Sequence, residues 1–258
     1  MHKERIAKAN DLYYNKYGTA GVCPGSRYGM ERNAGMSGKL IVIEGLDGSG
    51  KSTQTPLLEA ALRERGVFPR VISFPDYGDP SSTLVRMYLA GEFGTDADAV
   101  NAYAASSFYA VDRYAAYVRH WREDYCSGKM VLATRYTTSN VMHQMSKLPQ
   151  EQWEEYLAWL DDFEYCRMGI PRPDLVLFLD MPNEASQTLL SGRYGGDETK
   201  KDLHENNIEY LARCRKAADY AAARLEWKVI PCAQEGVPCP VEEIHRRVMK
   251  VVEKELSL

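Results

Sequence analysis

The stretch from Leu40 to Thr53 constrains the fold of this chain most, because an apolar run leads directly into a glycine-rich turn. Residues Gly45 to Ser52 fit the pattern G-x-x-x-x-G-K-[ST]. Glycines let backbone amides close around phosphate oxygens, and the start of the next helix adds the positive end of its dipole. The apolar run predicts a buried strand, and Gln54 to Arg65 predict a helix. This context favours a phosphate-binding loop over a chance match.

The two polar residues that close this motif predict separate contacts with a bound nucleotide. Lys51 supplies a point charge for the outer phosphates, and the Ser52 hydroxyl is an oxygen ligand for Mg²⁺. The sequence therefore predicts Mg²⁺ as the cofactor of this loop.

Length and charge narrow the classes of function. The chain has 258 residues, of which 45% are hydrophobic, and this suits a globular core. A net charge of -4 argues against a general nucleic-acid or membrane-surface protein. No apolar stretch approaches the ~18 residues of a membrane span, and the N-terminus has no hydrophobic signal core. We expect a cytoplasmic protein that binds neither a nucleic-acid polymer nor a membrane.

The six cysteines are scattered, with no Cys-x-x-Cys pair and no histidine cluster at metal spacing. This pattern predicts free, mostly buried thiols in a reducing compartment. Cys232 and Cys239 flank a turn and are the pair that a disulfide would join, but free thiols are the preferred interpretation.

From Gly38 onward, strand-like runs alternate with helical segments. The predicted strands are Leu40 to Glu44, Val71 to Phe74, Met130 to Ala133, Leu175 to Leu179 and Trp227 to Ile230. Their near-continuous apolar character and long spacers predict an α/β fold with a doubly wound, five-stranded parallel sheet. Ligands bind beyond the carboxyl ends of such strands. The candidate site segments are therefore Gly45 to Ser52, Pro75 to Tyr77, Thr134 to Ser139 and the residue Asp180.

A long helix is predicted from Ala97 to Tyr125, with aromatic residues recurring at helical spacing. Tyr109 and Arg113 share one face of it. A flat ring beside a guanidinium group suits a nucleobase that is stacked and hydrogen-bonded at its edge. A surface contact between the two side chains explains the spacing equally well.

Two segments differ from the rest of the chain. Residues 1–35 lack apolar periodicity, and we expect a weakly ordered or surface-packed extension before a single domain of residues 36–258. An arm that covers a partner subunit is the functional alternative. Residues 193–207 are rich in glycine and charge. They predict either a solvated connection or a lid with Arg193, Lys200 and Lys201 near the transferring phosphates.

The chain from Met36 onward resembles the thymidylate kinases, a nucleoside monophosphate kinase family that moves the γ-phosphate of ATP to dTMP. The family-like motifs are Glu44-Gly45-Leu46-Asp47, Phe74-Pro75, Tyr109 to Arg113, Arg135-Tyr136 with Ser139 and Gln144, Pro173-Asp174-Leu175, Leu179-Asp180, and Asp202 with Glu205.

The resemblance implies a P-loop nucleoside monophosphate kinase fold with a helical lid, which acts on ATP and dTMP and forms a homodimer. The catalytic residues that it implies are Lys51, Arg135 and Arg193. The implied ATP site is Gly45, Asp47, Gly48, Ser49, Gly50, Lys51, Ser52 and Thr53, with Ser52 on the metal. The implied acceptor site is Asp47, Phe74, Tyr109, Arg113, Arg135, Ser139 and Gln144.

Several positions depart from the family pattern. Thr134 stands where the Asp of Asp-Arg-Tyr is usual, and Tyr77 stands where an acceptor-binding Arg is common. One branch of the family carries an Arg in the lid at Leu203, and the other carries one in the loop at Gly48. The residues that remain to neutralise the charge of the transferring phosphates are Lys51, Arg135, Arg193, Lys200 and Lys201.

These departures keep two alternatives open. The first is a deoxynucleoside kinase on the same fold, against which Arg135 argues, since a nucleoside has no phosphate to bind. The second is a nucleotide-binding regulatory module without chemistry, which would bind ATP but release no ADP when an acceptor is added. A kinase for dTMP is the preferred function.

Overall fold

The computed structural model describes residues 37–256 except 97, 187–188 and 190–207. The predicted extension 1–35 lies outside the described residues, and so does almost all of the predicted lid with Arg193, Lys200, Lys201 and Leu203. The predictions about these segments stay predictions.

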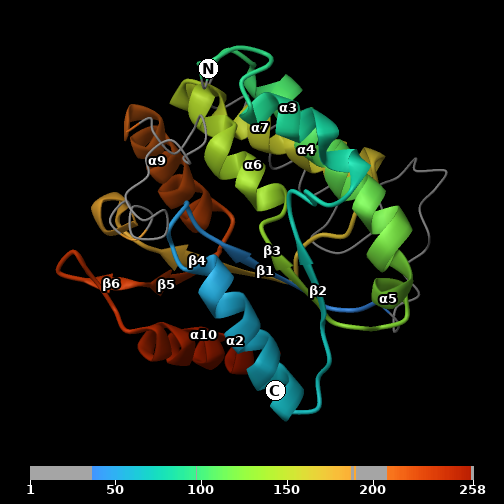
Figure 1. Ribbon diagram of the computed structural model, residues 1–258, viewed down its shortest axis with the longest axis vertical. Helices are drawn as coiled ribbons and strands as arrows, with labels where there is room; N and C mark the ends of the chain where they lie inside the picture. The colour runs from blue at the N-terminus through green and yellow to red at the C-terminus, as the bar shows by residue number, and fades with distance from the viewer. Residues whose placement is uncertain (1–36, 97, 187–188, 190–207, 257–258) are drawn as a thin grey trace, which may run out of the picture.

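The core of the fold is a five-stranded parallel sheet in the order β2-β3-β1-β4-β5 (Figure 1). The strands are β1 Leu40–Glu44, β2 Arg70–Ser73, β3 Val131–Thr134, β4 Leu175–Asp180 and β5 Lys228–Pro231. The prediction of a parallel α/β sheet is confirmed, with strand ends that differ by a residue. The ends of β2 are set by its pairing with β3, which matches Arg70 with Val131 and Ser73 with Thr134.

Helices cover both faces of the sheet. The longer ones are α2 Lys51–Glu64, α4 Ala102–Ala116, α9 Ile208–Arg224 and α10 Val241–Leu256, and the shorter ones include α3 Thr83–Leu89, α6 Thr137–His143 and α7 Trp153–Leu160. Side chains alternate along each strand. Ile41 and Ile43 of β1 therefore pack with α2 and α10, whereas Leu40 and Val42 pack on the opposite side near Trp121.

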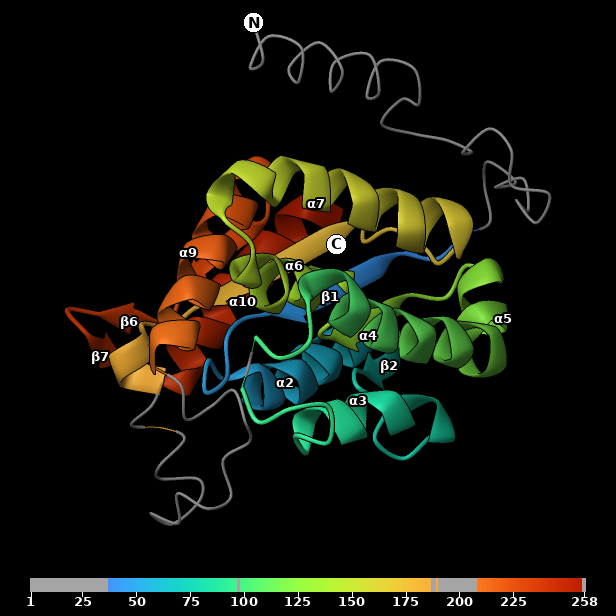
Figure 2. The ribbon, with the colours of Figure 1, turned by 90° about the horizontal axis from the view of Figure 1, so that it is seen from above.

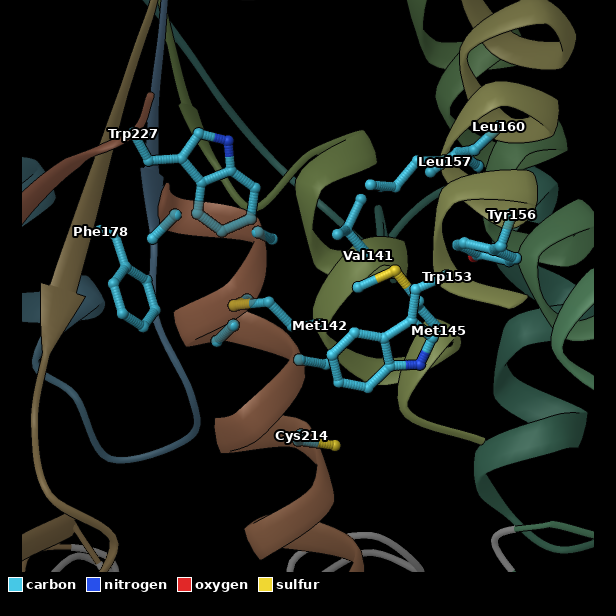
Figure 3. Close-up of a cluster of buried hydrophobic side chains, with 14 of the residues drawn as sticks. Val141, Met142, Met145, Trp153, Tyr156, Leu157, Leu160, Phe178, Cys214 and Trp227 are labelled. Atoms are coloured by element: carbon cyan, nitrogen blue, oxygen red, sulfur yellow. The ribbon is translucent and has the colours of Figure 1, made fainter. Parts of the chain in front are cut away.

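The largest buried cluster joins α6, α7 and α9 to the sheet (Figure 3). Val141 and Met142 of α6 lie between α9 and α7, and Phe178 of β4 and Trp227 close the cluster on the sheet side. Figure 2 shows α7 running alongside α6 and α9. This packing fixes α6, which begins two residues after Arg135.

The helix predicted from Ala97 begins at Ala102 instead, so its predicted start is wrong. The side chain of Asn101 accepts a hydrogen bond from the Ala104 amide at 2.9 Å and caps the first turn. The helix then continues through a π-helical segment, η2 Tyr117–Trp121, into α5 Arg122–Cys126.

Short elements connect the main ones. They are η1 Pro80–Ser82, η3 Met145–Lys147, η4 Gln150–Gln152, η5 Asp161–Arg167, and the two strands β6 Ala233–Gln234 and β7 Val237–Pro238, which pair antiparallel.

The prediction of free thiols is wrong for one cysteine. Cys126, Cys214, Cys232 and Cys239 are free, but Cys166 is disulfide-bonded. The preferred interpretation of Cys232 and Cys239 as free thiols is confirmed. Among the described residues, no helix has the length and apolar character needed to cross a membrane.

Candidate phosphoryl-transfer site

The glycine-rich loop connects the end of β1 to the start of α2, and its backbone requires glycine for different reasons at its two ends. A Cβ atom at Gly45 would lie 2.3 Å from the Ser49 hydroxyl oxygen and 3.0 Å from the Leu179 carbonyl oxygen. A Cβ at Gly50 would meet nothing within 4 Å, but the φ of +94° is left-handed. The loop is therefore tightly packed at Gly45 and open at Gly50.

Lys51 places its ammonium group inside this loop. Its Nζ donates to the carbonyl oxygens of Gly45 and Leu46, both at 2.8 Å. The amides of Thr53 and Gln54 bind the Gly50 carbonyl and begin the helix. The loop therefore combines a buried ammonium group with the positive end of α2, which is the arrangement that binds phosphate.

Arg135 connects the loop to α6. Its Nη2 donates to Asp47 at 2.5 Å, and its Nη1 lies 3.4 Å from the Ser139 hydroxyl oxygen. Arg135 has a φ of 63°, a left-handed conformation that costs a non-glycine residue on the order of 1 kcal/mol or more. The structure thus brings together three of the predicted acceptor residues: Asp47 after β1, Arg135 after β3 and Ser139 on α6.

Asp47 and Arg135 hold one another in their charged forms. Burial disfavours the ionised carboxylate of Asp47, but Arg135, Lys51 and His143 outweigh burial and hold its pKa well below the ordinary range. Burial also opposes the charge on Arg135, but Asp47 and Glu44 keep the pKa of its guanidinium well above the ordinary range. Asp47 is therefore an anion at physiological pH, and its carboxylate holds the guanidinium group of Arg135.

Glu44 is a buried carboxylate that organises the start of α6. It accepts hydrogen bonds from the Tyr136 amide at 3.0 Å, the Thr138 hydroxyl at 2.8 Å and the Ser139 hydroxyl at 2.7 Å. The Gly45 amide is a longer donor, at 3.3 Å. In the sequence, Glu44 stands out only as part of the motif Glu44-Gly45-Leu46-Asp47. Its signal was an acidic residue at the end of an otherwise apolar strand.

Tyr109 and Arg113 both lie on α4, but their surroundings differ. Arg113 is 1% exposed, and its Nε and Nη2 donate to Glu164 at 2.7 and 2.6 Å. The ring of Tyr109 meets the ring of Tyr88 edge-on, with 6.3 Å between centroids. The alternative of a surface contact between Tyr109 and Arg113 is therefore wrong for the arginine. Contact of either residue with an acceptor stays a prediction.

Comparison with known proteins decides the family. The family model described as thymidylate kinase matches residues 43–247. This chain belongs to the thymidylate kinase family.

Two relatives are similar to this chain in sequence, and one solved structure shares its fold. The chain is similar to the thymidylate kinase of Mycobacterium tuberculosis (strain CDC 1551 / Oshkosh), with 32% identity over 177 residues, 67% of this chain and 81% of the relative. It is 26% identical to the thymidylate kinase of Danio rerio over 222 residues, 86% of this chain and 92% of the relative. The structure of a thymidylate kinase from Candida albicans shares the fold, with a TM-score of 0.62 at 20% identity, covering 85% of this chain and 93% of that one.

Phe74 and Gln144 complete the described part of the predicted acceptor site of this thymidylate kinase family member. Phe74 is buried, precedes a cis peptide bond to Pro75 and packs on Tyr136 with 6.0 Å between ring centroids. A cavity of about 630 Å³ along β2 and the following loop is lined by Phe74 and Tyr77, and the phosphate-binding loop does not contribute to its lining. Gln144 is 1% exposed, and within the described part of the chain its Oε1 has no hydrogen-bond partner.

Thr134 takes the place of the family's aspartate at the end of β3. Its Oγ1 lies 2.9 Å from the Thr55 hydroxyl oxygen, and Thr55 in turn donates to the Lys51 carbonyl. Because the single hydroxyl proton of Thr55 is already used, Thr134 donates to it and keeps its own lone pairs. The hydroxyl oxygens of Ser52 and Thr134 are ligands of the hard type that Mg²⁺ accepts, without the charge of a carboxylate.

Proposed function

We propose that this chain transfers the γ-phosphoryl group of ATP to dTMP and releases ADP and dTDP. The observation that carries the proposal is the contact between Asp47 and Arg135. It joins the phosphate-binding loop to the residue that follows β3. Two cationic groups, Lys51 and Arg135, therefore lie at the same edge of the sheet, beyond the carboxyl ends of β1 and β3. Two phosphates that must approach one another need positive charge from both sides.

The donor phosphates would lie on the amides of the loop, with the Lys51 ammonium group turning from the carbonyls of Gly45 and Leu46 to the outer phosphates. Ser52 would hold Mg²⁺ together with oxygens of ATP. When bound, this ion supplies positive charge on the oxygens between which the phosphoryl group moves.

The acceptor phosphate would bind Arg135, whose guanidinium group is already oriented by Asp47 and Ser139. The ring of Tyr109 would stack on the base, and the Oε1 of Gln144, which has no hydrogen-bond partner among the described residues, would accept a hydrogen bond from it. No residue needs to form a covalent bond, because catalysis of this transfer consists of in-line positioning and charge stabilisation.

The deciding experiment measures ADP release from Mg-ATP with dTMP, dUMP, dCMP, dGMP, dAMP and thymidine as acceptors. The proposal expects the largest stimulation by dTMP. Stimulation by thymidine would indicate the deoxynucleoside kinase instead. ATP binding without stimulation by any acceptor would indicate a regulatory module, and would show that Thr134 cannot replace the family's aspartate.

Lys51→Ala tests the loop assignment. We expect a loss of turnover on the order of a hundredfold or more, because the variant lacks the charge that meets the outer phosphates. Lys250→Ala is a matched control, since Lys250 is exposed on α10. Near-normal turnover of Lys51→Ala, with circular dichroism spectra equal for both variants, would contradict the assignment.

We further propose that the chain forms a homodimer. Support comes from an apolar stripe on α4 and η2 formed by Val111, Tyr114 and Val118, all of them exposed.

A further inference from the structure

His143 ends α6 and lies between Arg135 and α9. Its Nε2 is 3.3 Å from the Nη1 of Arg135. Its Nδ1 is 3.5 Å from the Tyr210 hydroxyl oxygen and 3.7 Å from the Cys214 sulfur. Figure 3 shows Cys214 on α9, the helix that packs against α6. The imidazole thus bridges the arginine of the proposed acceptor site and a neighbouring helix.

The contacts determine which ring nitrogen carries the proton. A guanidinium N–H can only donate, so Nε2 must accept from Arg135. The Tyr210 hydroxyl donates to the backbone carbonyl of His143 at 3.0 Å, so it faces the imidazole with its oxygen rather than its proton. Burial raises the pKa of Cys214 to about 11, so its sulfur is a thiol at neutral pH. Because Nε2 accepts from Arg135, the proton of a neutral His143 lies on Nδ1.

We propose that His143 is a positioning residue of the phosphoryl-transfer site, which holds the guanidinium group of Arg135 toward Asp47 through a neutral imidazole protonated on Nδ1. The imidazolium form has no lone pair for Arg135 and adds a second positive charge 3.3 Å from it. Protonation of His143 therefore removes one of the contacts that hold Arg135 in place and leaves those with Asp47 and Ser139. The step from Arg135 to acceptor binding rests on the proposed function, whereas the contact between His143 and Arg135 does not.

The charged and titratable groups around His143 act in opposite directions. Arg135 opposes its protonation and Asp47 favours it, since His143 is one of the positive groups that act on Asp47. Glu44, Tyr77 and Tyr109 act electrostatically on Arg135. On the α9 and η3 sides, the polar groups of the described residues that contact His143 include Tyr210, Cys214 and Ser146, and Ser146 donates to its carbonyl at 2.9 Å.

The first test needs no enzymatic activity. In the full chain labelled with ¹⁵N-histidine, ring nitrogen shifts distinguish the two neutral tautomers and the imidazolium ion. The chain has five histidines, and the signal of His143 is assigned by its loss in His143→Gln. We expect a neutral ring with the proton on Nδ1 in the wild type at neutral pH. A ring protonated on Nε2, or on both nitrogens, would overturn the proposal.

The second test separates binding from turnover. Gln keeps an oxygen that accepts from Arg135 but does not titrate, whereas Leu offers no acceptor. We expect His143→Leu to raise the KM for dTMP about tenfold with a smaller change in kcat, and His143→Gln to keep a near-normal KM above neutral pH. Below neutral pH the wild-type KM rises more steeply than that of His143→Gln.

The acceptor phosphate itself titrates near pH ~6, so the informative quantity is the ratio of the two KM values at each pH. His245→Gln, on α10, is the matched control and should follow the wild type. An unchanged KM in His143→Leu, or equal pH profiles for wild type and His143→Gln, would overturn the proposal. If no acceptor supports turnover, the proposed function fails, and the tautomer measurement still decides the contact with Arg135.

Discussion

Lys147 places its ammonium group over the Tyr88 ring of α3, 5.0 Å from the ring centroid. Its Nζ donates to the Tyr88 hydroxyl at 2.7 Å and to the Val100 carbonyl at 3.0 Å. Neither partner carries a charge. Burial therefore lowers the pKa of Lys147 to about 8, although Asp98 and Asp96 act in the opposite direction.

This shift predicts how stability depends on pH. Between about pH 8 and the ordinary lysine pKa of 10.5, the unfolded chain holds the Lys147 proton and the folded chain does not. Stability from this group therefore rises with pH across that window. Lys147→Met should remove the rise, which amounts to roughly 1.5 kcal/mol between pH ~8 and ~9.5. Urea unfolding of both proteins at several pH values measures the difference, and parallel pH profiles would contradict it.

Individual residues of the site differ in how far the sequence predicts them. The phosphate-binding loop is a local pattern, so its glycines and Lys51 are predictable from spacing alone. Asp47 and Arg135 were predictable as neighbours because both follow strands of one parallel sheet. The partners of Arg113 and His143 were not, because Glu164 and Cys214 reach them only through the packing of helices that are distant in the sequence.

At the scale of elements, the ion pair of Arg113 and Glu164 joins α4 to η5. The side-chain amide of Asn140 on α6 also donates to Glu164, at 3.1 Å. Both charged side chains are fully buried, and Arg113 additionally donates to the Tyr136 carbonyl at 3.3 Å. The pair therefore links three elements, one of which carries the Ser139 and His143 side chains.

Removing one partner of this pair leaves an uncompensated charge in the interior. Arg113→Met should destabilise the fold by roughly 3–5 kcal/mol, because the Glu164 carboxylate stays buried without its cation. The double variant Arg113→Met with Glu164→Leu should regain much of that loss, since it buries no charge. Denaturant unfolding of the wild type, both single variants and the double variant measures the coupling. Additive losses would show that the two groups act independently.

The pattern of apolar side chains predicts the buried strands better than it predicts the ends of exposed elements. The apolar runs of β1, β3 and β4 are buried, and these strands were predicted closely. The edge strand β2 is largely exposed, so its end depends on pairing with β3 rather than on side-chain pattern. The start of α4 depends on the cap that Asn101 provides, which the predicted helix from Ala97 overlooked.

At the scale of the molecule, the long spacers between apolar runs predicted a parallel sheet, but they did not predict the order of its strands. A right-handed crossover allows the next strand to pair directly with the preceding strand, or to leave a gap in the sheet that a later strand fills. Here β3 lies between β2 and β1, which places the residue after β3 beside the phosphate-binding loop. The contact between Arg135 and Asp47 is a consequence of this order.

The outer side of α4 and η2 carries an apolar stripe with the spacing of one helical face. Val111, Tyr114 and Val118 are 44%, 42% and 43% exposed, and Leu84 of the neighbouring α3 is 40% exposed. Contiguous apolar surface of this kind is typical of protein interfaces. If a second copy covers the stripe, light scattering after gel filtration should give twice the mass of one chain.

The variant Val111→Asp with Val118→Asp tests this interface, because each new carboxylate would be buried without a partner when two copies associate. We expect the double variant to elute as a monomer with the circular dichroism of the wild type. Val237→Asp is the matched control, since Val237 is 66% exposed on β7 and should leave the dimer intact. A wild type that stays monomeric at micromolar concentration would exclude the homodimer. A double variant that stays dimeric would place the interface on another face.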